Sequence, residues 1–199
     1  MIDFVLIQKR VAHKYIFAIK SAVSLLTIAL AVLLPQIVHI VAGAPGGAKW
    51  LPMYLPVLIG GCLLGWRWGL AVGVLSPLAS YLVTLMAGNP MPIASRLPFM
   101  MAELAVFGFV SGLFSRKIMQ NGWTSFAGVV LAEVCGRATF IALVAIFQSV
   151  SALSLQAVLS QVQTGLPALL LQAVIVPFAV MALRAIIVKD NKESEYVRE

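Results

Sequence analysis

Long apolar runs, separated by short polar segments, dominate the chain and predict membrane-spanning helices. A helix that crosses a bilayer needs about 20 consecutive, mainly apolar residues. Six runs approach or exceed this length, at about residues 15–41, 51–64, 70–86, 97–114, 123–147 and 165–188. The pattern therefore predicts an all-α integral membrane protein with six transmembrane helices, which form one membrane domain over residues 14–188.

Two of the segments between the apolar runs have a composition that predicts their structure. Residues 42–49 are rich in Gly and Pro, so we expect a loop there, either a flexible gate over an outer site or a plain connector. Residues 149–162 are more polar, and their apolar positions recur at helical spacing. These apolar positions are Leu155, Val158, Leu159 and Val162. We therefore expect a short helix lying at the membrane surface.

The composition agrees with a membrane domain. Of the 199 residues, 61% are hydrophobic and only 11% are charged, whereas about 25% of the residues in a soluble domain are charged. So few charges cannot cover a soluble globule, and the length leaves no room for a separate catalytic domain. Cys62 and Cys135 both lie inside apolar runs, which favours packed thiols over a disulfide or a metal site.

The net charge of +7 is distributed in the way that orients helices in a membrane, and does not indicate nucleic-acid binding. With six spans and a cytoplasmic N-terminus, the inner segments contain Lys9, Arg10, Lys14, Arg67, Arg116, Lys117, Lys189, Lys192 and Arg198. The outer loops contain only Lys49 and Arg96. This asymmetry predicts that both termini are cytoplasmic, with residues 1–13 as an N-terminal lead-in and residues 189–199 as a charged tail.

Three ionisable residues fall well inside predicted spans, where each costs about 2.5–3.5 kcal/mol on insertion scales. They are Glu103, Glu133 and Arg137. Glu133 and Arg137 are four residues apart on one helix face and can pair. Glu103 and Arg137 should lie at similar depth in the outer half of the membrane. Two interpretations are open: a polar site lined by Glu103 and Arg137, or a structural ion pair that locks two helices together.

Further candidates for substrate contact lie at comparable depth or at the outer interface. Gln172 in the sixth span is a buried neutral polar residue, for which a helix–helix hydrogen bond is the alternative. The others are His39, Trp50, Met53 and Tyr54. For these, tolerated interfacial polarity or core packing is the alternative. No catalytic residues are predicted, because the chain lacks a Walker motif, G-x-S-x-G and H-E-x-x-H.

Short segments in several predicted helices form a combined pattern. They are LPMYLPVLIGG at 51–61 running into Leu64-Gly65, GLAVG at 69–73 with SPL at 76–78, MAELAVFG at 101–108, Gly136-Arg137, and Leu166-Pro167 with Gln172 and Pro177. Together they resemble the substrate-binding S components of energy-coupling factor (ECF) vitamin transporters. The resemblance covers roughly residues 15–188.

The resemblance implies an S component of a prokaryotic cell membrane that binds a vitamin or related micronutrient near its outer face. It implies partnership with a membrane T component and two cytoplasmic ATPases, which fits the missing ATPase motif and the expected absence of a cofactor. It also implies that Ala18 and Ala22, which match an Ala-x-x-x-Ala pattern, contact the T component. The alternatives are a membrane-embedded enzyme, or a helix-packing scaffold that uses Glu103, Glu133 and Arg137 structurally.

Overall fold

The computed structural model describes residues 1–2, 13–147 and 155–196, and these residues form an all-α fold without strands. Its helices are α2 (His13–Trp50), α3 (Tyr54–Leu64), α4 (Trp66–Met86), α5 (Leu97–Leu113), α6 (Ser115–Gln120), α7 (Thr124–Ile146) and α8 (Leu155–Tyr196). The all-α part of the fold class predicted from the sequence is confirmed.

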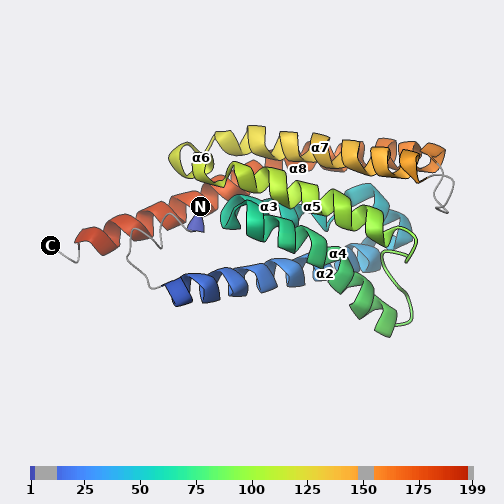
Figure 1. Cartoon of the computed structure of the whole chain (residues 1–199), viewed down its shortest axis with the longest axis horizontal. Helices are drawn as coiled ribbons and strands as arrows, with labels where there is room; N and C mark the ends of the chain where they lie inside the picture. The colour runs from blue at the N-terminus through green and yellow to red at the C-terminus, as the bar shows by residue number, and fades with distance from the viewer. Residues whose placement is uncertain (3–12, 148–154, 197–199) are drawn as a thin grey trace.

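The helices run roughly side by side, with α5 packed between α4 and α7 (Figure 1). The start of α2 and the end of α8 lie toward one end of the bundle, and the connection between α4 and α5 lies at the other (Figure 1). Helix α3 packs against α4 and α5, and α8 packs against α7 and α2. The buried surface of α5 is therefore covered by three neighbouring helices.

Within the described residues, four helical segments are long and apolar enough to cross a membrane: Lys14–Gly43, Trp66–Met86, Thr124–Ile146 and Gln156–Val188. The remaining two predicted spans correspond to α3, with 11 residues, and α5, with 17 residues. Both are apolar but shorter than a full crossing of about 20 residues. The total of six spans and the cytoplasmic location of the termini stay predictions.

The prediction of a loop at residues 42–49 is wrong, because helix α2 continues through this segment to Trp50. Only Gly43 leaves the helical conformation, with φ 68° and ψ −175°. Glycine adopts a positive φ without steric cost, so one residue makes a kink and the following residues resume the helix. A flexible gate of eight residues is therefore not present.

The prediction of a separate surface helix at 149–162 is also wrong for residues 155–162, which the structure describes. Residues 148–154 lie outside the described residues, and from Leu155 the chain is continuous with the last predicted span in α8. Val158 is buried in a cluster with Phe99, Phe140 and Val144. The apolar spacing thus marks a face packed on the bundle, and α8 also continues past Val188 to Tyr196.

Glycines bring α4 and α5 into backbone contact. A Cβ atom added at Gly69 would lie 2.2 Å from the carbonyl oxygen of Gly108, and one added at Gly108 would lie 2.0 Å from the carbonyl oxygen of Gly69. Small residues at helix interfaces in membranes allow such approach, which replaces the missing hydrophobic driving force with close packing. This contact fixes α5, and with it Glu103, relative to α4.

Candidate functional site

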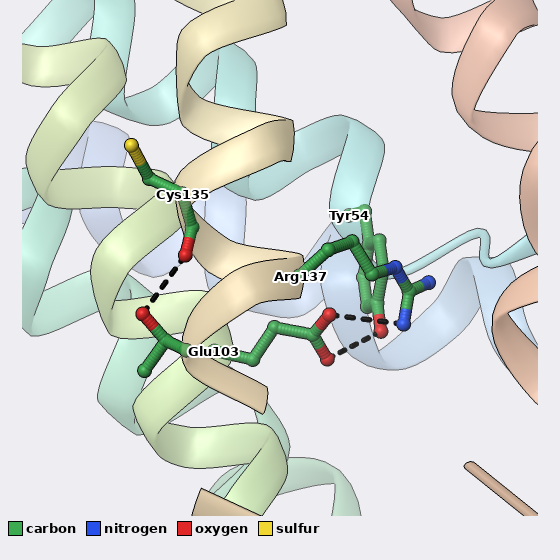
Figure 2. Close-up of polar contacts among 5 residues, drawn as sticks. Tyr54, Glu103, Cys135 and Arg137 are labelled. Atoms are coloured by element: carbon green, nitrogen blue, oxygen red, sulfur yellow. Dashed lines mark hydrogen bonds and ion pairs between the residues drawn. The ribbon is translucent and has the colours of Figure 1, made fainter. Parts of the chain in front are cut away.

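Three buried side chains from three helices meet in the interior of the bundle (Figure 2). The Tyr54 hydroxyl on α3 donates a 2.7 Å hydrogen bond to Oε2 of Glu103 on α5. Nη1 of Arg137 on α7 lies 3.0 Å from Oε1 of the same carboxylate. The guanidinium carbon of Arg137 also lies 5.0 Å from the centre of the Tyr54 ring, a distance typical of a cation–π contact.

This cluster balances its charge but leaves hydrogen-bonding capacity unused. The ion contact between Arg137 and Glu103 is close, yet its alignment is not that of a hydrogen bond. Among the described residues, none of the three guanidinium nitrogens of Arg137 has a hydrogen-bond partner. Buried donors are normally paired. Arg137 is therefore held mainly by the charge of Glu103 and by the face of the Tyr54 ring.

Packing of aromatic rings holds Tyr54 in place within this cluster. The Tyr54 ring meets the Phe107 ring edge-on, with 4.9 Å between ring centres and an interplanar angle of 88°. Phe107 in turn lies against Gly136, where an added Cβ would come within 2.0 Å of the ring. The residue before Arg137 is therefore glycine for a packing reason, and this packing connects α7 to Tyr54.

Glu133 is not a member of the cluster, although it lies one turn before Arg137 on α7. Its side chain is 7% exposed and its Oε1 atom is buried without a hydrogen-bond partner. No ion pair joins Glu133 to Arg137 in the described part of the chain. The within-helix pairing that the spacing allowed is thus not formed, because Arg137 turns toward Glu103 on α5.

A cavity of about 250 Å³ opens at the end of the bundle where the α2–α3 and α4–α5 connections lie. Tyr54 is the residue shared by the cavity wall and the buried cluster. The lining residues are Pro35, Leu51, Pro52, Met53, Tyr54, Ser80, Pro90, Met91, Pro92, Ile93, Arg96, Met100 and Gln161. Most of this lining is apolar, which is typical of small-molecule sites.

The predicted substrate contacts divide into two groups when compared with this cavity. Met53 and Tyr54 line it, whereas Glu103 and Arg137 lie behind Tyr54 and do not. Trp50 and His39 also do not line the cavity. Trp50 is 44% exposed, and the Nδ1 atom of His39 is buried without a partner among the described residues.

Gln172 reaches the cavity wall indirectly. Its Nε2 atom donates to the carbonyl oxygens of Trp50 and Leu51, at 3.1 Å in each case. Leu51 has φ 46°, a left-handed conformation that is uncommon for a residue other than glycine. The α8 side chain therefore anchors a sharp turn between α2 and α3, and that turn contributes Leu51 to the cavity.

Several lining residues were not among the sequence candidates, and two of them are polar and unsatisfied. Arg96 Nε and Gln161 Oε1 are buried atoms without a hydrogen-bond partner in the described ranges. Arg96 had a usable signal, since it is one of only two cations in the predicted outer loops. Gln161 had none, because its segment was interpreted as a surface helix. No cluster of three or more His, Cys, Asp or Glu side chains occurs among the described residues.

Comparison with protein families identifies the class of this membrane protein. Residues 20–189 match the model of the family described as "ECF transporter, substrate-specific component". This match covers most of the chain, including nearly all of the helical bundle, the buried cluster and the cavity. The chain therefore belongs to the family of substrate-specific components of ECF transporters. Comparison with curated proteins and with solved structures found no match.

Proposed function

We propose that this chain captures a vitamin or related micronutrient at the outer face of a prokaryotic cell membrane, in the cavity beside Tyr54. Delivery inward requires a membrane T component and two cytoplasmic ATPases. The family match over residues 20–189 is the observation that carries this proposal. The cavity supports it, because a substrate-binding subunit needs an enclosed, mainly apolar site with a few polar groups.

The distribution of cations supports an outward-facing cavity. Lys14 at the start of α2, Arg67 at the start of α4, and Arg116 with Lys117 in α6 lie at the end of the bundle opposite the cavity. Cytoplasmic loops have an excess of Lys and Arg. We therefore propose six spans, including the short helices α3 and α5, with both termini cytoplasmic. In this arrangement residues 14–188 form the membrane domain.

The buried cluster and the cavity take different parts in this proposal. Tyr54 and Met53 contact the ligand directly, since both line the cavity. Glu103 and Arg137 act on the ligand through Tyr54, whose hydroxyl is bound to Glu103. Gln172 acts through Leu51. Trp50 and His39 do not line the cavity and have no direct ligand contact in this proposal, and Ala18 and Ala22 contact the T component.

Native mass spectrometry of the purified chain is the first test of binding. A co-purified small molecule of vitamin-like mass is the expected result. The second test places the chain in liposomes with and without the T component and ATPases. The chain alone should bind the molecule without accumulating it, and the full assembly should accumulate it only with ATP. The proposal is wrong if no vitamin binds in a broad screen, or if the chain alone turns the molecule over.

A further inference from the structure

Few polar groups in the cavity are free to contact a ligand, and the charged one among them is positive. Among the described lining residues, Arg96 is the one with a charged side chain. Ser80 is occupied, because its hydroxyl donates to the carbonyl oxygen of Met91. Tyr54 is occupied by Glu103. Arg96 and Gln161 therefore remain as the polar side chains with unpaired buried atoms.

The chain offers Arg96 almost no acidic partner at this end of the bundle. Its seven acidic residues are Asp3, Glu103, Glu133, Asp190, Glu193, Glu195 and Glu199. Five of them belong to the first three or last ten residues of the sequence. Glu103 already pairs with Arg137. No ion pair joins Arg96 to an acidic side chain in the described ranges. The Nε atom of Arg96 is buried without a partner, so an anion from outside the chain could satisfy this donor and balance the charge.

Two helix N-termini beside the cavity contribute positive potential, and the carbonyl oxygens beside it at the C-terminal end of α2, those of Trp50 and the following Leu51, already accept hydrogen bonds from Gln172. Met53 is the cap residue before α3, and Arg96 is the cap residue before α5. A helix N-terminus has a partial positive charge whose effect is confined to the first turn. Helix α4 contributes Ser80, which lies more than one turn before its C-terminal end at Met86. Its opposing partial negative charge is therefore further from the cavity.

The size and the remaining lining define the rest of the ligand. About 250 Å³ is at or just below the lower limit of small-molecule sites, roughly 300–1,000 Å³. Met53, Met91 and Met100 contribute flexible, polarisable thioether side chains, which adapt to an irregular apolar surface. A compact apolar body fits such a wall better than a polyhydroxylated one, because the wall has few hydrogen-bonding groups to replace water.

We propose, on the basis of the proposed binding function, that the ligand is a compact, largely apolar molecule with a single carboxylate. The carboxylate binds the Arg96 guanidinium, whose planar donors match two carboxylate oxygens. Gln161 lines the same cavity, and its unpaired Oε1 accepts a hydrogen bond from a neutral polar group of the ligand. Arg96 is then the residue that selects acids over their neutral or cationic counterparts.

The test compares acids with their neutral counterparts, using the purified full chain in lipid nanodiscs and isothermal titration calorimetry. The acids are biotin and lipoate; the neutral counterparts are biotinamide and lipoamide; thiamine and riboflavin represent cationic and uncharged vitamins. At least one acid should bind, and its neutral counterpart should bind roughly 10- to 100-fold more weakly, the ratio expected for one charge-assisted contact.

Variants assign this selectivity to Arg96. Arg96→Gln should weaken acid binding by roughly 10- to 100-fold and change binding of the neutral counterpart little. Lys49→Gln removes the other cation at this end, an exposed side chain that does not line the cavity, and should leave both affinities unchanged. Because Arg96→Gln could disturb folding, Arg96→Lys and Gln161→Glu provide independent evidence. The first keeps the positive charge but loses the two-pronged contact, so it should weaken acid binding less than Arg96→Gln does, and the second should weaken it by repulsion.

Equal affinity for an acid and its neutral counterpart would overturn the inference, as would binding of thiamine or riboflavin alone. Either result would still support the proposed function, because a vitamin would be bound. Failure of the whole panel to bind would also overturn the inference, whereas the proposed function fails only if no vitamin binds in the broad screen.

Discussion

The guanidinium of Arg137 on α7 lies 3.0 Å from the carboxylate of Glu103 on α5, and both side chains are almost fully buried. Removing one member of such a pair leaves an uncompensated charge in a low-dielectric interior. Glu103→Gln should therefore lower the free energy of unfolding by about 3–5 kcal/mol. Thermal unfolding of the purified protein in detergent, followed by circular dichroism, measures the effect.

The double variant Glu103→Gln/Arg137→Gln should recover part of this loss, because neither charge is then unpaired. Glu133→Gln is the matched control, since Glu133 is a buried carboxylate without an ion pair to Arg137 in the described structure. It should destabilise the protein much less. If the single Glu103 and Arg137 variants unfold like the wild type, the pair has no structural role, and direct contact with ligand becomes the better interpretation.

The turn between α2 and α3 should depend on Gln172. Gln172→Leu removes the amide that donates to the carbonyl oxygens of Trp50 and Leu51, so both carbonyl oxygens lose this hydrogen bond. A loss of about 1–3 kcal/mol in unfolding free energy is expected. Ligand affinity should fall as well, because Leu51 lines the cavity. Calorimetric titration and thermal unfolding together measure these two effects.

Gln163→Leu is the control for this prediction, since Gln163 lies exposed on the same helix. Its stability and affinity should equal those of the wild type. Loss of stability without loss of affinity in Gln172→Leu would show that the turn does not shape the cavity.

The contact between α4 and α5 should not tolerate one added methyl group. In Gly69→Ala, the added Cβ would lie 2.2 Å from the carbonyl oxygen of Gly108, so the two helices must separate. Overpacking of this kind costs about 1–3 kcal/mol. Val83→Ile, which adds one carbon on an exposed position of the same helix, should be neutral. Equal unfolding temperatures for the two variants would contradict the close approach.

The sequence predicted the helices well because lipid imposes a strong length and hydropathy requirement on each span. The sequence predicted the helix ends less well where residues typical of loops or surfaces lie inside a continuous helix. Residues 42–49 contain helix-breaking Gly and Pro, but Gly43 alone absorbs the break. The segment from Leu155 has polar residues typical of a surface helix, but Val158 packs on the bundle and α8 stays continuous.

The sequence predicted part of the candidate site, because it indicates the depth of a residue in the membrane but not the direction of its side chain. Buried ionisable residues are rare in spans, so Glu103 and Arg137 were identifiable from depth alone. Whether they line a cavity depends on which way each side chain turns, and Tyr54 lies between them and the open space. Arg96 lies just before α5 and Gln161 lies in the second turn of α8, and only the fold brings both to one cavity.

Ala18 and Ala22 lie on an exposed face of α2, at the end of the bundle opposite the cavity. Ala18→Leu/Ala22→Leu adds bulk where the proposed T component approaches, without disturbing the cavity. Calorimetric ligand affinity of the isolated chain should be unchanged, while ATP-driven uptake by the reconstituted assembly should fall by about tenfold or more, since close helix approach needs small residues. Ala138→Leu/Ala142→Leu is the matched control, because these alanines have the same spacing and are exposed on α7. Normal uptake in the α2 variant, or equal loss in the α7 variant, would place the partner surface elsewhere.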